Sequence, residues 1–305
     1  MNLKKNLNIL ITGSTGLFGI NFYNYSNQNN VYYLIHKKKL KLKNSVYINL
    51  NSNDKIYNFL KKKKINTVLH AASSTNIDKI EKNKKTSFTN IFTISKKLAE
   101  VCSRLNIKLV YISTDQLFDG SKKKYSENSK TNPLNYYGYL KKKTEECVIK
   151  LSKKNLIIRT NFFGFGTNYR KSFSDFILDN LKNSNYIKLV SDAYFSPVYV
   201  KTCIKLILKL IHSNAKGIYN ISCDQKISKF DFGVKVSKKL KLNKKFILKS
   251  LLEDLNMVKR PKNMCLTNHK IKNKLNIKHI DINKEISKLK YDYFNLNYLK
   301  TKKLK

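Results

Sequence analysis

The chain of 305 residues has little of several residue types, and each shortage excludes a class of protein. It has no tryptophan, three prolines and nine glycines. Its five cysteines are odd in number and never form a Cys-x-x-Cys pair, which argues against a zinc site or a disulfide framework. We expect no metal site and reduced thiols that fill core positions. The cysteines are Cys102, Cys147, Cys203, Cys223 and Cys265.

Long apolar runs are also missing. The most apolar stretch, Ile204–Ile211, contains Lys205 and Lys209 and is far shorter than the roughly 20 residues that a membrane span needs. Leu7–Thr12 is too short for a signal-peptide core. Because 41% of the residues are hydrophobic, a sizeable core is available. We expect a cytoplasmic globular protein.

Acidic residues are scarce beside the basic ones, which gives a formal net charge of +43. A strong positive charge is typical of proteins that bind nucleic acid. However, only four basic residues are arginine, the residue that makes bidentate contacts with bases and phosphates. The lysines are scattered from Lys4 to Lys305. We interpret them as a compositional bias and do not expect nucleic acid as a partner.

Short apolar runs alternate with amphipathic stretches over residues 7–160. This pattern predicts an α/β fold with a doubly wound parallel sheet, the Rossmann arrangement. The helical stretches are Ile56–Lys64, Ser87–Arg104 and Tyr136–Lys153. The predicted strands are Leu7–Thr12, Val31–Ile35, Val46–Ile48, Thr67–Ala71, Lys108–Ser113 and Leu156–Thr160.

The regular alternation ends after Thr160. Helices are predicted at Phe173–Lys182, Val200–His212 and Lys229–Leu240, with a strand at Gly217–Ile221. We therefore expect a nucleotide-binding domain over 1–160. A smaller C-terminal substrate-binding lobe over 161–305 would return some segments to the main sheet.

Three of the nine glycines, Gly13, Gly16 and Gly19, follow the first strand at three-residue spacing. Glycines in this position allow a tight turn and a close approach of the backbone to a diphosphate. The helix that follows presents free N–H groups to phosphate oxygens. This motif predicts a dinucleotide cofactor.

The second strand ends at His36 and Lys37, with no acid to hold the ribose hydroxyls of NAD. A basic residue there suits the additional phosphate of NADP. We therefore prefer NADP(H), while NAD(H) remains possible.

Tyr137 and Lys141 stand four residues apart at the start of a predicted helix, so they share one face. A neighbouring ammonium favours the phenolate form of tyrosine and so eases proton transfer. Thr114, at the end of the preceding predicted strand, can hydrogen-bond the same substrate oxygen. This pattern is typical of a carbonyl-reducing site.

These segments resemble the extended short-chain dehydrogenase/reductase family, and within it the dTDP-4-dehydrorhamnose reductases. The resemblance covers the chain to about residue 275. The matching segments, in order, are Ile11–Gly19, His70–Ala72, Val110–Asp115, Phe118–Gly120, Tyr137 with Lys141, Ile158–Thr160, Ser196–Val200, Gly217–Asn220 and Arg260–Pro261.

The resemblance implies a role for individual residues. Tyr137 would protonate the substrate oxygen, Thr114 would orient the carbonyl, and Lys141 would hold the nicotinamide ribose and lower the pKa of Tyr137. Asp115, Phe162 and Arg260 would contact the substrate, and Ser74 and Asn90 would border the site. The cofactor would contact Gly13, Gly16, Leu17, Phe18, Gly19, His36, Lys37, Ala71, Ala72, Ser73 and Thr75, together with Tyr137 and Lys141.

The resemblance therefore implies an NAD(P)H-dependent reductase of a nucleotide-activated 4-keto-6-deoxy sugar, and a homodimer is compatible with it. Two departures concern the substrate: Gln116 stands where the reductases commonly have tyrosine, and Phe162 or its neighbour replaces a tryptophan. Gln116 also replaces the glutamate that dehydratases use, so reduction is favoured over water elimination. An epimerase with tightly bound NAD and a catalytically idle nucleotide-binding regulatory subunit remain as alternatives.

Overall fold

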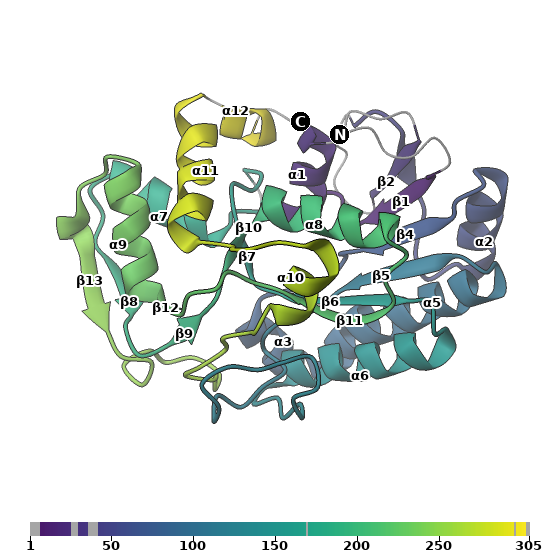
Figure 1. Ribbon diagram of the computed structural model, residues 1–305, viewed down its shortest axis with the longest axis horizontal. Helices are drawn as coiled ribbons and strands as arrows, with labels where there is room; N and C mark the ends of the chain where they lie inside the picture. Colours follow the sequence, from purple (N-terminus) through teal and green to yellow (C-terminus); the bar gives the residue numbers. More distant parts are fainter. Residues whose placement is uncertain (1–6, 26–29, 36–41, 169, 296, 303–305) are drawn as a thin grey trace.

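A seven-stranded parallel sheet forms the centre of the protein (Figure 1). The computed structural model describes residues 7–25, 30–35, 42–168, 170–295 and 297–302. The chain order reverses between β1 and β4, which confirms the predicted doubly wound fold. In spatial order the strands are β11 (Gly217–Ile221), β6 (Leu156–Thr160), β5 (Lys108–Ile112), β4 (Thr67–His70), β1 (Ile9–Thr12), β2 (Val31–Ile35) and β3 (Ser45–Tyr47).

Helices cover both faces of this sheet because successive strand residues point to opposite sides. Ile9 and Ile11 of β1 belong to one core cluster with α1 (Leu17–Tyr25) and α8 (Val200–His212). Leu10, between them, belongs to the opposite cluster. The helices of that second face are α2 (Asn53–Lys62), α5 (Ile94–Arg104) and α6 (Tyr136–Leu151).

The predicted helix over Ser87–Arg104 is divided in the structure. A π-helix at Phe88–Thr93 separates α4 (Lys84–Ser87) from α5. The short helix α3 (Ile77–Lys82) precedes them. Hydrophobic spacing cannot distinguish the wider turn, because a π-turn only adds one residue to an otherwise helical pattern. Such turns frequently occur at functional sites.

The chain beyond Thr160 builds small sheets and helices beside the central sheet, while β11 joins that sheet next to β6. One hydrophobic cluster contains Ile9 of β1 as well as Leu289, so the core runs through both halves, and the boundary at residue 160 stays a prediction. The paired strands are β7 (Phe162–Phe163) with β10 (Val198–Tyr199), β8 (Ile187–Val190) with β13 (Ile247–Ser250), and β9 (Tyr194–Phe195) with β12 (Ile227–Ser228). The helices are α7 (Phe173–Lys182), α9 (Lys229–Lys239), the 3₁₀ helix η2 (Lys244–Phe246), α10 (His269–Leu275), α11 (Ile282–Phe294) and α12 (Asn297–Lys302).

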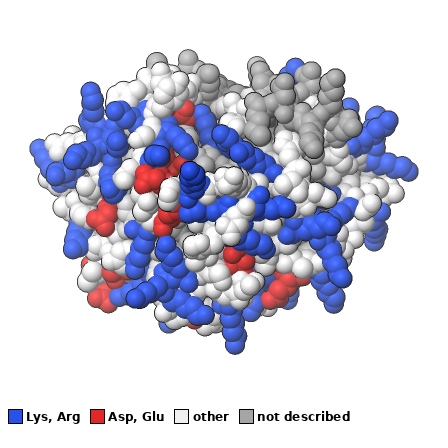
Figure 2. Space-filling model, viewed as in Figure 1, with Lys and Arg blue, Asp and Glu red and all other residues white. Residues whose placement is uncertain are grey.

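The basic side chains are spread over the surface. Figure 2 shows lysine and arginine scattered over the described part of the visible face, with a few acidic groups between them. All five cysteines are free thiols. Within the described ranges, no helix combines the length and the apolar character needed to cross a membrane.

Candidate active site

The glycine loop joins β1 to α1 in a space that admits no side chain. Gly13 has φ = 74°, in the left-handed region, and a Cβ atom there would lie 2.6 Å from the Ala71 carbonyl carbon. A Cβ atom on Gly19 would lie 2.4 Å from the Cα of Ser14. The Gly16 N–H donates to the Gly13 carbonyl at 2.9 Å. The loop is therefore tight and presents backbone to its surroundings.

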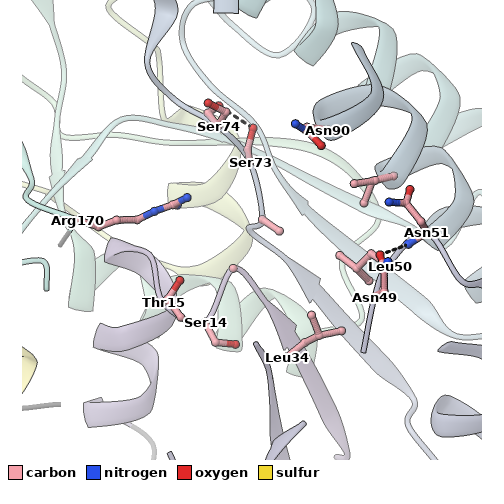
Figure 3. A pocket seen from close by; sticks show the side chains of 13 residues that line it. Ser14, Thr15, Leu34, Asn49, Leu50, Asn51, Ser73, Ser74, Asn90 and Arg170 are labelled. Atoms are coloured by element: carbon pink, nitrogen blue, oxygen red, sulfur yellow. Dashed lines mark hydrogen bonds between the residues drawn. The ribbon is translucent and has the colours of Figure 1, made fainter. Parts of the chain in front are cut away.

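A cavity of about 420 Å³ opens beside this loop (Figure 3). It lies at the carboxyl ends of the strands around the reversal of chain order, the position where open α/β sheets bind ligands. Its walls come from the glycine loop, the ends of β2, β3 and β4, the π-helix and the segment before α7. The lining residues are Gly13, Ser14, Thr15, Leu34, Asn49, Leu50, Asn51, Ala72, Ser73, Ser74, Asn90, Ile94 and Arg170.

Some of the predicted cofactor residues line this cavity and others do not. Gly13, Ala72 and Ser73 line it, as do the expected bordering residues Ser74 and Asn90. The remaining predictions in the described ranges are not among the lining residues: Gly16, Leu17, Phe18, Gly19, Ala71, Thr75, Tyr137 and Lys141. His36 and Lys37 lie outside the described residues.

Leu17 and Phe18 point their side chains into the core rather than into the cavity. Phe18 is 3% exposed, and its ring centroid lies 5.9 Å from that of Phe162. These two residues begin α1, so they can serve a phosphate through the free N–H groups of the first helical turn. Gly16 and Gly19 contribute to the same loop because neither has a side chain. The space beside each of them is left for nearby backbone atoms.

Several cavity residues were not predicted. Asn49–Asn51 follow β3, and Leu34 lies near the end of β2. The sequence contains one indication of their place in the site: they come at or just after the end of a predicted strand. The carboxyl ends of parallel strands lie at one edge of the sheet, which is where ligands bind. Arg170 had no such signal, because it belongs to a loop far along the chain.

His70 is a structural residue in the sheet beneath the site. Its Nε2 lies 2.8 Å from Ser95 Oγ, and its Nδ1 lies 2.6 Å from Thr12 Oγ1. The Ser95 hydroxyl donates to the Ile91 carbonyl, so Nε2 carries the proton and Nδ1 accepts from Thr12. Burial, and then the charge of Lys141, lower the pKa of His70 to about 3, so the ring is neutral.

Thr114 and Tyr137 meet at the carboxyl end of β5. Asn135 caps α6 by accepting a hydrogen bond from the Gly138 N–H at 2.9 Å. Gly138 packs against the chain after β5, because a Cβ there would lie 2.3 Å from the Gln116 carbonyl oxygen. This close packing holds the start of α6 against the chain that follows β5, and Thr114 lies near enough to Tyr137 to influence its pKa.

The environment of Tyr137 keeps it a neutral phenol. The residue is 8% exposed. Burial raises its pKa above the usual value, the hydrogen bond with Thr114 opposes that shift, and the charge of Asp115 adds to it. The expected lowering of this pKa by Lys141 is therefore not what the structure shows. A neutral phenol is the form that can donate a proton.

Lys141 lies one helical turn beyond Tyr137 and is 2% exposed. Its Nζ donates to the Ile112 carbonyl at 2.7 Å and lies 4.1 Å from the centroid of the Tyr111 ring. Burial lowers its pKa to about 7, against the opposing charge of Glu145. The Lys141 side chain is thus held at the carboxyl end of β5 by contacts that involve neither Tyr137 nor Thr114.

The predicted substrate residues lie in three different settings. Asp115 is 2% exposed and accepts a hydrogen bond from Asn161 Nδ2 at 2.7 Å, and burial raises its pKa. Phe162, which belongs to β7, packs against Phe18 of α1. Arg260 pairs with Asp78 at 2.7 Å.

Arg260 also lines a second cavity of about 780 Å³. The wall of this cavity is joined to the start of α6, because Asn135 Nδ2 donates to the Lys259 carbonyl at 3.2 Å. Val258, another lining residue, packs in the hydrophobic cluster that contains Tyr137. The second cavity therefore adjoins the Tyr137 side of the site.

A dinucleotide-type glycine loop beside a buried threonine, tyrosine and lysine at the carboxyl edge of a parallel sheet defines the class of extended short-chain dehydrogenases/reductases. Residues 7–293 match the family model described as RmlD substrate binding domain, and the chain belongs to this family.

The relatives of the chain have different names. The chain is 28% identical over 249 residues to a dTDP-4-dehydrorhamnose reductase of Aggregatibacter actinomycetemcomitans, covering 77% of this chain and 83% of the relative. It is 26% identical over 231 residues to methionine adenosyltransferase 2 subunit beta of Xenopus tropicalis, covering 73% and 69%. The crystal structure of dTDP-4-dehydrorhamnose reductase from Bacillus anthracis in complex with NADP has a TM-score of 0.82 at 24% identity, covering 93% of this chain and 98% of that one.

Proposed function

We propose that the protein is an NADPH-dependent reductase that converts the keto group of a nucleotide-activated 4-keto-6-deoxy sugar into a hydroxyl. The observation that carries the proposal is the set of buried side chains Thr114, Tyr137 and Lys141 at the carboxyl end of β5, on the same sheet edge as the cavity built on the glycine loop. The reductase names among the relatives support the same substrate class.

The residues present fit a dinucleotide. Gly13 and Gly19 leave space that a Cβ atom would fill, and the loop ends at the first turn of α1, where free N–H groups can receive a diphosphate. Thr15 and Ser73 add hydroxyls to the same cavity. When bound, the nicotinamide supplies a hydride to the carbonyl carbon of the sugar.

Tyr137 supplies the proton that this reduction needs. Its hydroxyl is un-ionised at neutral pH and can transfer its proton to the carbonyl oxygen as that oxygen gains negative charge. The Thr114 hydroxyl donates to Asp115 Oδ1 at 3.3 Å and accepts from the Gln116 N–H at 3.2 Å, so it is fixed in place near Tyr137. Lys141, one helical turn further along α6, donates to the Ile112 carbonyl at 2.7 Å and so ties this helix to the end of β5.

Arg260 and the second cavity are suited to the nucleotide part of the substrate. Lys259, Arg260 and Lys262 line this cavity together with Asp119 and Glu253, so its lining carries a small positive charge that suits a diphosphate. The contact between Val258 and the Tyr137 cluster places this charge next to the reacting end of the site. Gln116, which carries no carboxylate, favours reduction over water elimination.

Oxidation of NADPH, followed by absorbance, tests the proposal. We expect cofactor loss that depends on dTDP-4-keto-6-deoxy sugar, with a slower rate when NADH replaces NADPH. Loss of cofactor without sugar serves as the background. If the protein binds NADPH and consumes none with this sugar, the assignment as a reductase of this substrate is wrong. Copurifying NAD with no net consumption would instead identify an epimerase.

A second candidate is a nucleotide-binding subunit without turnover, because relatives named methionine adenosyltransferase 2 subunit beta match much of the chain. The buried Thr114, Tyr137 and Lys141 favour the reductase, since a protein that only binds does not need this set. Stoichiometric NADPH binding with no turnover on any keto sugar nucleotide would favour the subunit.

A further inference from the structure

Arg170 extends from the C-terminal half of the chain into the cavity beside the glycine loop. Figure 3 shows its side chain directed into the cavity from the side opposite Leu50 and Asn51. A Cβ atom placed on Gly16 would lie 3.8 Å from Nη1 of Arg170, so the guanidinium lies next to the start of α1. Its position beside Gly16 therefore brings a cation to the part of the loop that precedes a helix N-terminus.

The turn that carries Arg170 is firmly held. The Arg170 N–H donates to Thr167 Oγ1 at 3.1 Å, and a Cβ atom on Gly166 would lie 2.2 Å from the Arg170 carbonyl oxygen. The carboxylate of Asp175, which is 0% exposed, accepts from the Gly166 N–H at 2.7 Å and from the Ser172 N–H at 2.8 Å. These bonds fix the backbone at Gly166 and at Ser172, within a few residues of Arg170.

The same turn is tied to the helix of the glycine loop. Asn21 of α1 donates to the Phe165 carbonyl at 2.9 Å, and Asn21 is 3% exposed. The segment before Arg170 and the helix that follows the glycine loop are thus joined by a buried hydrogen bond. The arginine is placed beside the phosphate-binding backbone by the fold itself.

The guanidinium of Arg170 has no carboxylate within ion-pairing distance among the described residues. Arg159 and Arg260, in contrast, pair with Glu145 and Asp78. Arg170 is exposed, and its charge is therefore available to a ligand in the cavity. An arginine can make two parallel hydrogen bonds to phosphate oxygens.

We propose that Arg170 binds the diphosphate of the dinucleotide and, with the glycine loop, encloses it from two sides; this rests on the proposed function. The diphosphate is favoured over the 2′-phosphate because Nη1 lies by Gly16 and the first turn of α1, where a diphosphate binds. The ribose of the adenosine lies at the end of the second strand in such folds, on the Leu34 side of the cavity.

Binding of NADPH, NADH and ADP to the full chain and to Arg170→Ala tests this assignment. A contact with the diphosphate is common to all three ligands. We therefore expect each dissociation constant to rise by a similar factor, roughly 10- to 100-fold, as loss of a charged hydrogen bond predicts. Arg170→Lys keeps the charge without the planar fork and should restore part of the affinity.

Lys171→Ala is the matched control. It removes the same charge one residue along, from a side chain that is exposed and pairs with Asp179 at 2.8 Å. We expect it to leave all three dissociation constants nearly unchanged. Equal melting temperatures of wild type and Arg170→Ala without ligand would show that the variant is folded.

The outcomes separate this inference from the proposed function. A loss confined to NADPH would show that Arg170 reads the 2′-phosphate and would overturn the assignment. Unchanged binding of all three ligands would overturn it as well, with the dinucleotide site intact. A wild-type protein that binds none of the ligands would refute the proposed function itself, and the role of Arg170 with it.

Discussion

At the scale of single residues, burial shifts the pKa values of Tyr137 and Lys141 in opposite directions. Tyr137 and Lys141 are both almost fully buried, and burial raises the pKa of the phenol while it lowers that of the ammonium. Each shift favours the neutral form. Tyr137 lies near Thr114, whereas the Lys141 ammonium donates to a backbone carbonyl.

Replacing Tyr137 with phenylalanine tests the proton donor. The ring still fills its place among Ile80, Ile91 and Leu140, but no hydroxyl remains to protonate the carbonyl oxygen. We expect kcat to fall by about 100-fold or more, the usual contribution of general acid catalysis. The dissociation constant of NADPH should stay almost unchanged. Retained turnover would refute the role of Tyr137.

The depressed pKa of Lys141 predicts a change of stability with pH. Its pKa is about 7 in the folded protein and about 10.4 in the unfolded chain. Between these values the unfolded chain binds more protons, so the contribution of Lys141 to stability rises with pH in this window. Below pH 7 the full cost of burying the charge is present.

We therefore expect the stability of Lys141→Met, relative to wild type, to be highest near pH 6 and to fall as the pH rises towards 10. Melting temperatures of both proteins at pH 6, 8 and 9.5 measure this difference. Lys142→Met removes the same charge from the surface of the same helix, where Nζ lies 4.0 Å from Glu146, and controls for net charge. A difference that does not vary with pH for Lys141→Met would contradict the prediction.

At the scale of elements, the beginning of α7 organises the segment that reaches the glycine loop. Ser172 and Asp175 form a reciprocal capping box, and Asp175 also holds the Gly166 N–H. The helix cap and the loop before it therefore depend on one buried carboxylate. This arrangement connects the stability of α7 to the position of Arg170.

Replacing Asp175 with alanine should destabilise the protein by about 1–3 kcal/mol, since it removes a cap and leaves buried N–H groups without a partner. The affinity for NADPH should fall at the same time, because the turn that carries Arg170 loses its support. Denaturant unfolding and cofactor titration measure the two effects. Asp179→Ala, on the exposed side of α7, should cost less than about 1 kcal/mol. Equal effects of the two variants would be evidence against the special role of Asp175.

At the scale of the whole molecule, the two halves of the chain share their core and a sheet. The same cluster contains Ile9, Ile207 and Leu289, and β11 pairs with β6 over five residues. The Tyr199 N–H donates to the buried carboxylate of Glu285 at 2.9 Å, which ties α11 to β10. Homodimer formation and a cytoplasmic location stay predictions.

A shared core predicts that the protein unfolds in one cooperative transition. Unfolding followed by far-ultraviolet circular dichroism, which reports helices, and by tyrosine fluorescence should give coincident midpoints. A saturating amount of NADPH should shift both midpoints upward together. Two separated transitions would show that residues 1–160 and 161–305 are independent folding units, as the domain boundary drawn from the sequence would allow.

The sequence by itself determined the elements and the chemistry that depend on local spacing. Strand–helix alternation predicted the doubly wound sheet, β2, β6 and α7 have the predicted bounds, and four-residue spacing placed Tyr137 and Lys141 on one helix face. Only the tertiary structure decided what depends on contacts between distant segments. It placed Arg170 beside Gly16, paired the Lys141 ammonium group with the Ile112 carbonyl of β5 and brought Asn49–Asn51 into the cavity. Periodicity records which side of an element is buried, whereas such contacts depend on how elements pack, and no local pattern encodes that packing.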